Sequence, residues 1–131
     1  MHDIRNPFSK DTNINRDVAS FEWLNLEDQS TIQLILETFA DRYKKKILDV
    51  SSDKPRSVTE MLDLCEMPTT SGYRIIKSLV EDNLLIPTSS FVTSKGRTSK
   101  KYISVFENMK IDIAEDELII RIKLAKNFPR T

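Results

Sequence analysis

Hydrophobic residues recur at helical spacing between residues 68 and 86, and the rest of the chain is organised around this stretch. At about 100° per residue, Ile76, Leu79 and Val80 share one face. The opposite face carries Thr70, Arg74, Lys77, Ser78 and Glu81. One face is therefore expected to pack against the protein, and the other is free to contact a partner.

Both ends of this helix are marked in the sequence. Pro68 holds the preceding residue extended, and Thr69 is the expected N-cap, because its hydroxyl can accept hydrogen bonds from the first turn. Asn83 is expected just past the C-terminal end with a positive φ, since asparagine tolerates the left-handed conformation. Apolar residues 84–86 then begin a strand.

The preceding segments also show helical periodicity. Apolar residues at positions 32, 35, 36 and 39 predict a helix capped by Ser30 or Thr31, and Asp41 is a candidate cap for a second segment over residues 42–52. The pattern leaves open whether these are one bent helix or two. The lysines at 44–46 form either a solvated helix face or a phosphate contact.

Residues 58–67 predict a short helix that follows Ser57. Ser57 and Glu60 have the spacing of a capping box, and Cys65 belongs to the apolar stripe that follows. Cys65 is therefore expected to be a small buried hydrophobic residue, with redox sensing as the alternative. The three-residue link 66–68 to the next helix is typical of a helix-turn-helix.

Two strand-like runs on either side of Gly96 predict a β-hairpin over residues 86–106. The first strand includes Phe91 and Val92, and the second runs from Tyr102 to Phe106. Four cations surround the turn with no acidic residue between them: Lys95, Arg97, Lys100 and Lys101. They either protect an edge strand or form a tip that contacts phosphate, and their concentration favours phosphate.

Both ends of the chain carry apolar segments outside this core. Alternating apolar residues from Met109 to Leu124, interrupted at 114–116, predict a second hairpin with one apolar face. Residues 1–30 begin polar and end in an apolar cluster of Phe21, Trp23, Leu24 and Leu26. This cluster either covers its own domain or packs on a second subunit, since aromatic residues are enriched at such contacts.

Composition excludes several classes of function. The 131 residues suit one domain with extensions, and 39% hydrophobic with 31% charged residues suit a soluble globular chain. No run approaches the ~18 apolar residues of a membrane span and no secretory signal is recognisable, so a cytoplasmic, nucleoid-associated location is expected. One cysteine with one distant histidine, His2, provides no zinc site, and two glycines provide no nucleotide-binding loop. We therefore expect no metal, no cofactor and no catalytic residues.

The net charge is zero, but the charge is unevenly placed. Residues 1–53 carry 7 basic and 10 acidic side chains, residues 54–102 carry 8 and 5, and residues 103–131 carry 5 and 5. Zero net charge taken alone argues against a generic polyanion binder. The positive excess of the middle region is modest, but it coincides with the central helix and the basic hairpin.

The stretch SVTEMLDLCEMPTTSGYRIIKSLVEDNLL and the basic hairpin SKGRTSKKY resemble a winged helix-turn-helix transcription regulator of the ArsR-like and TrmB-like type common in archaea. The resemblance covers residues 32–106. It implies a recognition helix in the major groove and a wing on the adjacent minor groove or phosphates. The DNA-binding residues are then Thr70, Ser71, Tyr73, Arg74 and Lys77 in the helix and Lys95, Arg97, Lys100 and Lys101 in the wing.

Three features depart from the family pattern. Gly72 stands where an aliphatic residue is usual, and Asn83 stands where glycine usually ends the helix. Glycine allows close approach of helices, and asparagine tolerates the left-handed turn. No cysteine or histidine cluster is present, which removes metal sensing. Tyr73 borders both the packed and the polar face, so it either packs or contacts DNA.

The sequence therefore predicts an α+β protein in three parts: an arm over 1–30, a winged helix-turn-helix domain over 31–106, and a β-hairpin extension over 107–131. The expected function is sequence-specific binding of double-stranded DNA in transcription regulation. A homodimer is expected, formed through Phe21, Trp23, Leu24 and Leu26, through the C-terminal hairpin, or through both. The alternative is a winged-helix protein–protein interaction module of a larger transcription-related assembly.

Overall fold

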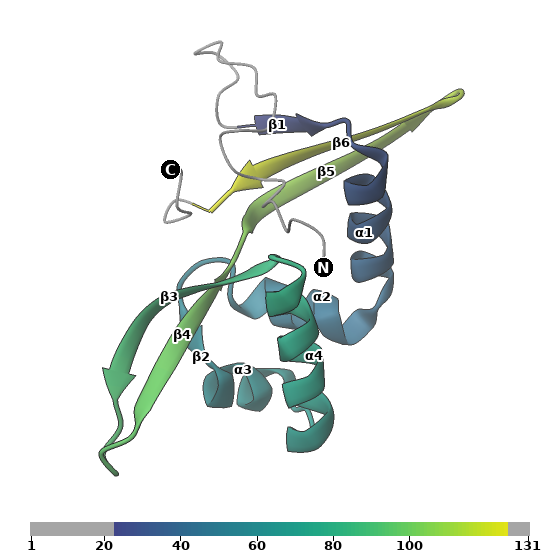
Figure 1. Cartoon of the computed structure of the whole chain (residues 1–131). Coiled ribbons are helices and arrows are strands. Elements are labelled where there is room, and N and C mark those ends of the chain that lie inside the picture. The colour runs from purple at the N-terminus through teal and green to yellow at the C-terminus, as the bar shows by residue number, and fades with distance from the viewer. Residues whose placement is uncertain (1–22, 126–131) are drawn as a thin grey trace, which may run out of the picture.

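The structure of the chain is a computed structural model that describes residues 23–125. Within that range the fold is α+β, as predicted, with four helices and two three-stranded antiparallel sheets (Figure 1). In chain order the elements are β1 (Trp23–Leu26), α1 (Gln29–Ala40), α2 (Arg42–Val50), β2 (Arg56–Ser57), α3 (Val58–Cys65), α4 (Thr69–Glu81), β3 (Leu85–Val92), β4 (Thr98–Ser104), β5 (Phe106–Ala114) and β6 (Glu117–Leu124).

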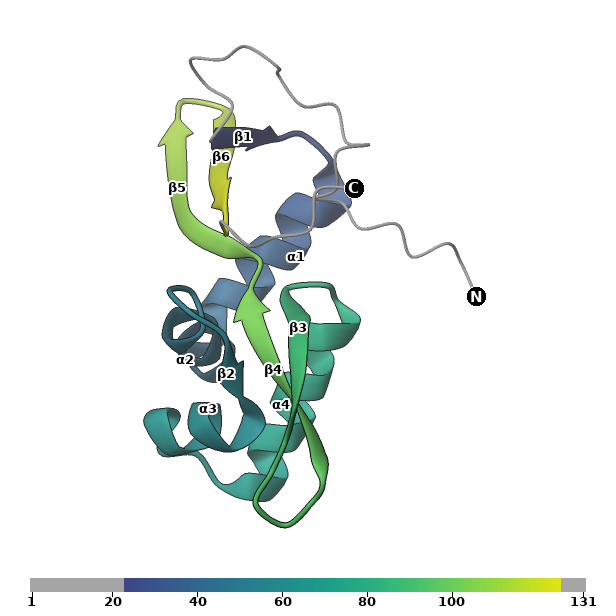
Figure 2. The same cartoon turned by 90° about the vertical axis from the view of Figure 1, so that its left-hand side faces the viewer.

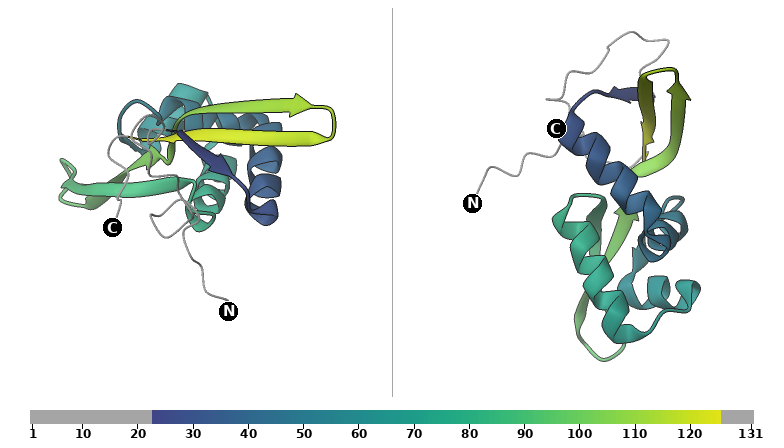
Figure 3. Two further views of the ribbon diagram at one scale, coloured as in Figure 1. Left: turned by 90° about the horizontal axis from the view of Figure 1, so that it is seen from above. Right: turned by 90° about the vertical axis from the view of Figure 1, so that its right-hand side faces the viewer.

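The two sheets lie at opposite ends of the molecule. One has the order β2-β4-β3 and accompanies α2, α3 and α4, whereas the other has the order β1-β6-β5 and lies against α1 (Figures 1 and 2). β4 ends at Ser104 and β5 begins at Phe106, so these two successive strands connect the two ends of the molecule (Figure 3). Val105 fixes this junction, because its N–H donates to Leu84 O at 3.0 Å and its carbonyl accepts from Ala125 N–H at 3.0 Å.

Asp28 caps α1, so the prediction of Ser30 or Thr31 as the cap is wrong. One carboxylate oxygen of Asp28 accepts from the Thr31 N–H at 2.9 Å and from the hydroxyls of Ser30 and Thr31 at 2.6 and 2.8 Å. These hydrogen bonds, led by that of Ser30, lower the pKa of the Asp28 carboxyl. Thr31 is thereby inside the helix and buried, where it cannot cap.

Residues 29–50 form two helices, which settles the question that the periodicity left open. Asp41 adopts an extended conformation between them and accepts from the N–H groups of Tyr43 and Lys44 at 3.0 and 3.2 Å. The prediction of Asp41 as a cap is therefore confirmed. Of the lysine run, Lys45 forms an exposed ion pair with Asp49 at 3.0 Å.

The predicted capping box of α3 is present. Ser57 Oγ accepts from the Glu60 N–H at 3.2 Å, and Glu60 accepts in return from the Ser57 N–H at 2.9 Å. Cys65 is 3% exposed, and burial raises the pKa of its thiol, which disfavours the reactive thiolate. These observations agree with the prediction of Cys65 as a buried hydrophobic residue.

The second predicted hairpin is β5–β6, with Met109, Ile111 and Ile113 opposite Ile122, Ile120 and Leu118. Its turn is narrower than the three residues expected, since Ala114 pairs with Glu117. Glu115 in that turn has φ 53°. The apolar face is buried toward its base, where Ile120 and Ile122 are fully buried, and exposed toward its tip.

The apolar cluster at the end of the predicted arm pairs within its own chain. Trp23–Leu26 form β1, antiparallel to β6, and Leu24 belongs to the buried core. Leu26 packs against that core, and Trp23 is half-buried beneath the Lys110 ammonium, 4.7 Å from the ring centroid. Phe21 lies outside the described residues. None of the helices within residues 23–125 is long and apolar enough to cross a membrane.

Candidate nucleic-acid interface

α4 begins one residue earlier than predicted. Pro68 is the N-cap and no side chain caps the helix, so the prediction of Thr69 as N-cap is wrong. Pro68 suits this place because its φ of −60° and extended ψ lead into the helix, and its carbonyl accepts from the Gly72 N–H at 2.8 Å. The N–H groups of the first turn therefore receive no side-chain cap.

The orientation of α4 is set by its contact with α3. Ile76 and Leu79 are buried as predicted, and Gly72 is buried against Leu62. A Cβ at position 72 would overlap the end of the Leu62 side chain, so Leu62 of α3 occupies the space that a larger residue at this position would need. The packing of Leu62 on Gly72 agrees with the expected close contact between the two helices.

The opposite face of α4 is exposed. Thr70, Arg74 and Lys77 are exposed, Ser71 is half-buried, and Tyr73 is 53% exposed. Tyr73 therefore lies more with the outward face than with the core. Arg74 and Lys77 are three residues apart, so their side chains project from neighbouring positions of one helix face.

The end of α4 directs the chain into β3. Asn83 has φ 63°, as predicted, and its N–H donates to Val80 O at 3.0 Å. The next N–H, of Leu84, donates to Leu79 O at 2.9 Å, and both Leu84 and Leu85 are fully buried. This left-handed residue reverses the chain so that β3 and β4 run back alongside the helices.

The tip of the β3–β4 hairpin is closed by Thr93. Its N–H donates to Arg97 O at 2.7 Å, and its hydroxyl accepts from the Arg97 N–H at 3.2 Å. Gly96, with φ 79°, supplies the left-handed position of the three-residue loop. Lys95 and Arg97 flank this glycine at the exposed tip. Sequence reasoning missed Thr93, although a threonine three residues before a turn glycine was available as a signal.

Lys100 and Lys101 lie farther back and on opposite faces of β4. Lys101 lies over the Phe91 ring, with Nζ 5.5 Å from the centroid. It also acts on Glu60, whose carboxyl pKa is lowered first by the hydrogen bond from the Ser57 N–H and also by the charge of Lys101. Lys100 is exposed on the other face. The structure thus brings Lys95 and Arg97 together but separates them from Lys101.

The cations of α4 and of the hairpin tip are not neutralised within residues 23–125. No ion pair described there includes Arg74, Lys77, Lys95 or Arg97. The start of α4 and the hairpin tip lie at the same end of the molecule, away from the β1-β6-β5 sheet (Figures 1 and 2). Exposed, uncompensated cations at one end form a surface suited to an anionic partner.

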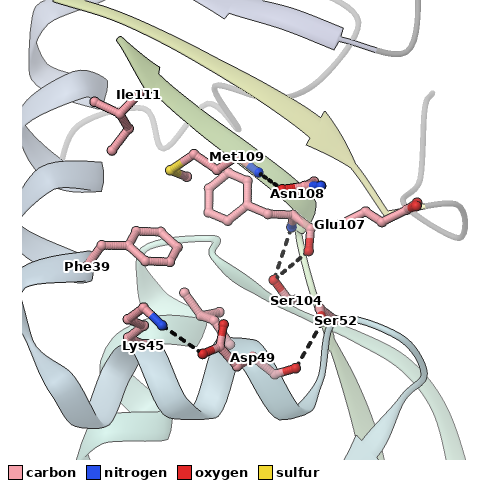
Figure 4. Close-up of a pocket in the computed structure, with 11 residues that line it drawn as sticks. Phe39, Lys45, Asp49, Ser52, Ser104, Glu107, Asn108, Met109 and Ile111 are labelled. Atoms are coloured by element: carbon pink, nitrogen blue, oxygen red, sulfur yellow. Dashed lines mark hydrogen bonds and ion pairs between the residues drawn. The ribbon is translucent and has the colours of Figure 1, made fainter. Parts of the chain in front are cut away.

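A separate cavity of about 430 Å³ lies between the helices and β5. Phe39 from α1 and Met109 and Ile111 from β5 point toward it, and Lys45 and Asp49 form an ion pair at its border (Figure 4). The rings of Phe39 and Phe106 lie 6.0 Å apart. The sequence pattern contains no signal for this cavity, because its walls come from segments far apart in the chain.

The described residues contain no cluster of three or more histidine, cysteine, aspartate or glutamate side chains that could hold a metal ion. The exposed side chains of α4 and the hairpin tip include cations, hydroxyls, the Tyr73 phenol and the Glu81 carboxylate. No protein-family model, curated protein or solved structure matches this chain.

Proposed function

We propose that this chain is a winged helix-turn-helix protein that binds double-stranded DNA as a transcription regulator, with α4 as the recognition helix and the β3–β4 hairpin as the wing. The element order α2-β2-α3-α4-β3-β4 and the sheet order β2-β4-β3 support the proposal. The observation that carries it is the set of exposed cations without ion pairs at one end of the molecule, Arg74, Lys77, Lys95 and Arg97.

The outward face of α4 suits the major groove. Arg74 can contact a guanine edge through two parallel N–H donors, and Lys77 is placed one turn along for a second base or a flanking phosphate. Thr70 and Ser71 lie in the first turn, where hydroxyls and uncapped backbone N–H groups can contact a phosphate. Tyr73 adds a large exposed side chain beside them.

The tip of the hairpin suits phosphates or a narrow minor groove. Lys95 and Arg97 extend from a turn that is held by Thr93 and Gly96, so the cations are displayed on a defined backbone. Lys100 extends this charge along one face of β4. Lys101 contributes from the face nearer to α3, where it also contacts Phe91.

Function as a protein–protein module has support of its own. Leu64, Tyr73 and Val92 are exposed by 52%, 53% and 70%, and the chain as a whole has a formal net charge of zero. Exposed apolar side chains of this kind occur at protein contacts. The two functions make opposite predictions for binding to DNA of arbitrary sequence.

Titration of the full chain against a random duplex at several salt concentrations tests the proposal. A DNA-binding protein should bind at low salt, and its affinity should fall as salt rises, because phosphate contacts release counterions. The informative variant is Lys77→Glu, which reverses one charge on the outward face of α4. Its matched control is Lys46→Glu, the same change on the exposed face of α2.

Loss of affinity in Lys77→Glu with retention in Lys46→Glu supports α4 as the binding surface. Equal loss in both variants would instead assign a phosphate contact to the lysine run of α2. No binding of the unmodified chain at low salt rejects the proposal and favours the protein–protein module.

A further inference from the structure

The β1-β6-β5 sheet has an open edge. β5 is its outer strand, with β6 on one side and no strand on the other within residues 23–125. The pair Ala114 and Glu117 closes a two-residue loop, and such closing pairs are hydrogen-bonded, so the backbone groups of Met109, Ile111 and Ile113 point away from β6. The Met109 N–H agrees with this direction, because it donates to the neighbouring Asn108 Oδ1 at 2.8 Å.

This edge lacks the protection found on the other sheet. Pro87 and a register shift interrupt β3, the corresponding edge of the β2-β4-β3 sheet. On β5 the register shift lies near the start of the strand, and residues 109–114 pair without interruption. Ile111 is 42% exposed and Ile113 is 78% exposed. A regular strand edge with exposed isoleucines is a template for another strand.

We propose that β5 pairs antiparallel with β5 of a second copy of this chain, around a two-fold axis at Ile111. The two three-stranded sheets then become one six-stranded sheet. This inference deepens the proposed function, because a symmetric dimer supplies the second recognition helix, but the association itself requires no DNA.

Charge selects the register of this pairing. With Ile111 opposite Ile111 of the second copy, Lys110 lies opposite Asp112, and Asp112 lies opposite Lys110. Moving the axis by one residue places either Lys110 opposite Lys110 or Asp112 opposite Asp112, and like charges directly opposite each other destabilise a pair of strands. Of these three registers, only the one centred on Ile111 places opposite charges across from each other.

Contacts within each chain already hold these two side chains on the outer face of the sheet. Asp112 accepts from Arg121 at 3.0 Å, and Lys110 lies over the Trp23 ring. The paired charges of the second copy would extend this exposed network across the two-fold axis.

The same register fills the cavity beside β5. The cavity is lined by Met109 and Ile111 of β5 but by no described residue of β6 or β1, so it lies beside the outer strand of the sheet (Figure 4). In the proposed pairing, Ile113 of the second copy lies opposite Met109 on the face that borders this cavity. An isoleucine that is largely exposed in one chain thus enters the apolar space near Phe39 of the other.

Sedimentation of the full chain without DNA tests the proposed dimer. We expect the unmodified chain to be a dimer at tens of micromolar, and Ile113→Asp to raise the dissociation constant by about tenfold or more. The matched control is Val92→Asp, the same kind of change at a 70% exposed residue near the tip of the other hairpin, which should leave association unchanged. Both positions are exposed in the monomer, so circular dichroism should show folded protein in each case.

A charge exchange tests the register. Lys110→Glu alone and Asp112→Lys alone each place like charges opposite each other in a homodimer, and each should weaken association by about tenfold. Mixing the two variants should restore dimers. The glutamate introduced into one chain then faces the lysine introduced into the other, and the unchanged Asp112 and Lys110 face each other. Recovery in the mixture but not in either variant alone is expected only for pairing around Ile111.

A monomer at tens of micromolar overturns the inference, as does a dimer that is insensitive to Ile113→Asp. Absence of recovery in the mixture overturns the register. Failure of the dimer and failure of the proposed function can be distinguished. A stable dimer that binds no DNA rejects DNA binding alone, and a monomer that binds random duplex rejects this dimer alone.

Discussion

The two hairpins that follow α4 differ in what their cations do. In β3–β4, Lys95 and Arg97 lie at an exposed tip without ion pairs in the described chain. In β5–β6, Arg121 pairs with Asp112 at 3.0 Å and Lys123 pairs with Glu107 at 3.4 Å. The two tip cations of β3–β4 therefore produce an attractive field, whereas these two cations of β5–β6 are largely neutralised.

The two hairpins also differ in how far their apolar residues are buried. The first residue of β3, Leu85, is buried, but the following positions are half-buried or exposed, and most of them are serine, threonine or proline. β6 alternates from Ile120 to Leu124, with Ile120, Ile122 and Leu124 in the core. One hairpin is thus joined to the protein only at its base and extends away, whereas the other forms a sheet that covers α1. The difference is consistent with the two proposals made above, contact with DNA through the first hairpin and contact with a second copy through the second.

The largest difference in DNA affinity is expected between a variant that lacks two cations of the first hairpin and one that lacks two cations of the second. Lys95→Gln with Arg97→Gln should reduce affinity for every duplex by roughly a hundredfold and flatten the salt dependence by about one unit per lost phosphate contact. Arg121→Gln with Lys123→Gln removes the same charge from the other hairpin and should leave DNA affinity nearly unchanged. Titrations of both double variants against one random duplex provide the measurement. Equal loss in the two would show that only total charge matters.

Arg74→Ala should change specificity instead of general affinity. Loss of a bidentate contact with guanine reduces discrimination by about 1–3 kcal/mol, so the ratio of affinities for a selected site and a scrambled duplex should fall. Arg97→Ala at the hairpin tip should lower both affinities together, because phosphates carry no sequence information. The two variants are compared on both duplexes at several salt concentrations. Unchanged binding in both would remove α4 and the wing as the DNA-reading surface.

Local patterns predicted the elements well, because period and capping depend on neighbours in the chain. The face of α4, the capping box at Ser57 and the left-handed Asn83 were all readable in this way. The cap of α1 was wrong because Asp28, Ser30 and Thr31 all suit an N-cap, and tertiary burial of Thr31 decides between them. Which competing cap is used cannot be read from propensity alone.

Pairings between distant segments could not be predicted. Trp23–Leu26 pair with β6, about a hundred positions later in the chain, and periodicity contains no information on such a partner. The same limit applies to the candidate surface. The sequence grouped Lys100 and Lys101 with the tip cations, but strand alternation puts them on opposite faces of β4, farther along the strand from Gly96.

The base of the wing should be more sensitive to substitution than its tip. Asn83→Val should destabilise the protein by roughly 1 kcal/mol or more, because a β-branched residue resists a φ of 63°. Asn83→Gly should be neutral or mildly stabilising, since glycine adopts this conformation without strain. Chemical denaturation of both variants measures the difference. Equal stability of the two would mean that the left-handed turn does not constrain the start of β3.

In the turn of the β5–β6 hairpin, substitution of the residue with positive φ should stabilise the protein, and the effect should be smaller than the destabilisation by Asn83→Val. Glu115 has φ 53°, and glutamate lacks the short side chain that lets asparagine adopt this conformation readily, so Glu115→Gly should stabilise the protein by roughly 0.5 kcal/mol. Asp116→Gly is the matched control, because position 116 has no positive φ and glycine there only adds freedom to the unfolded chain. Denaturation of all variants is measured at the same protein concentration, so that self-association contributes equally to each free energy of unfolding. Gain in Glu115→Gly with loss in Asp116→Gly would locate the backbone strain of this hairpin at one residue, and equal loss in both would show that Glu115 bears none.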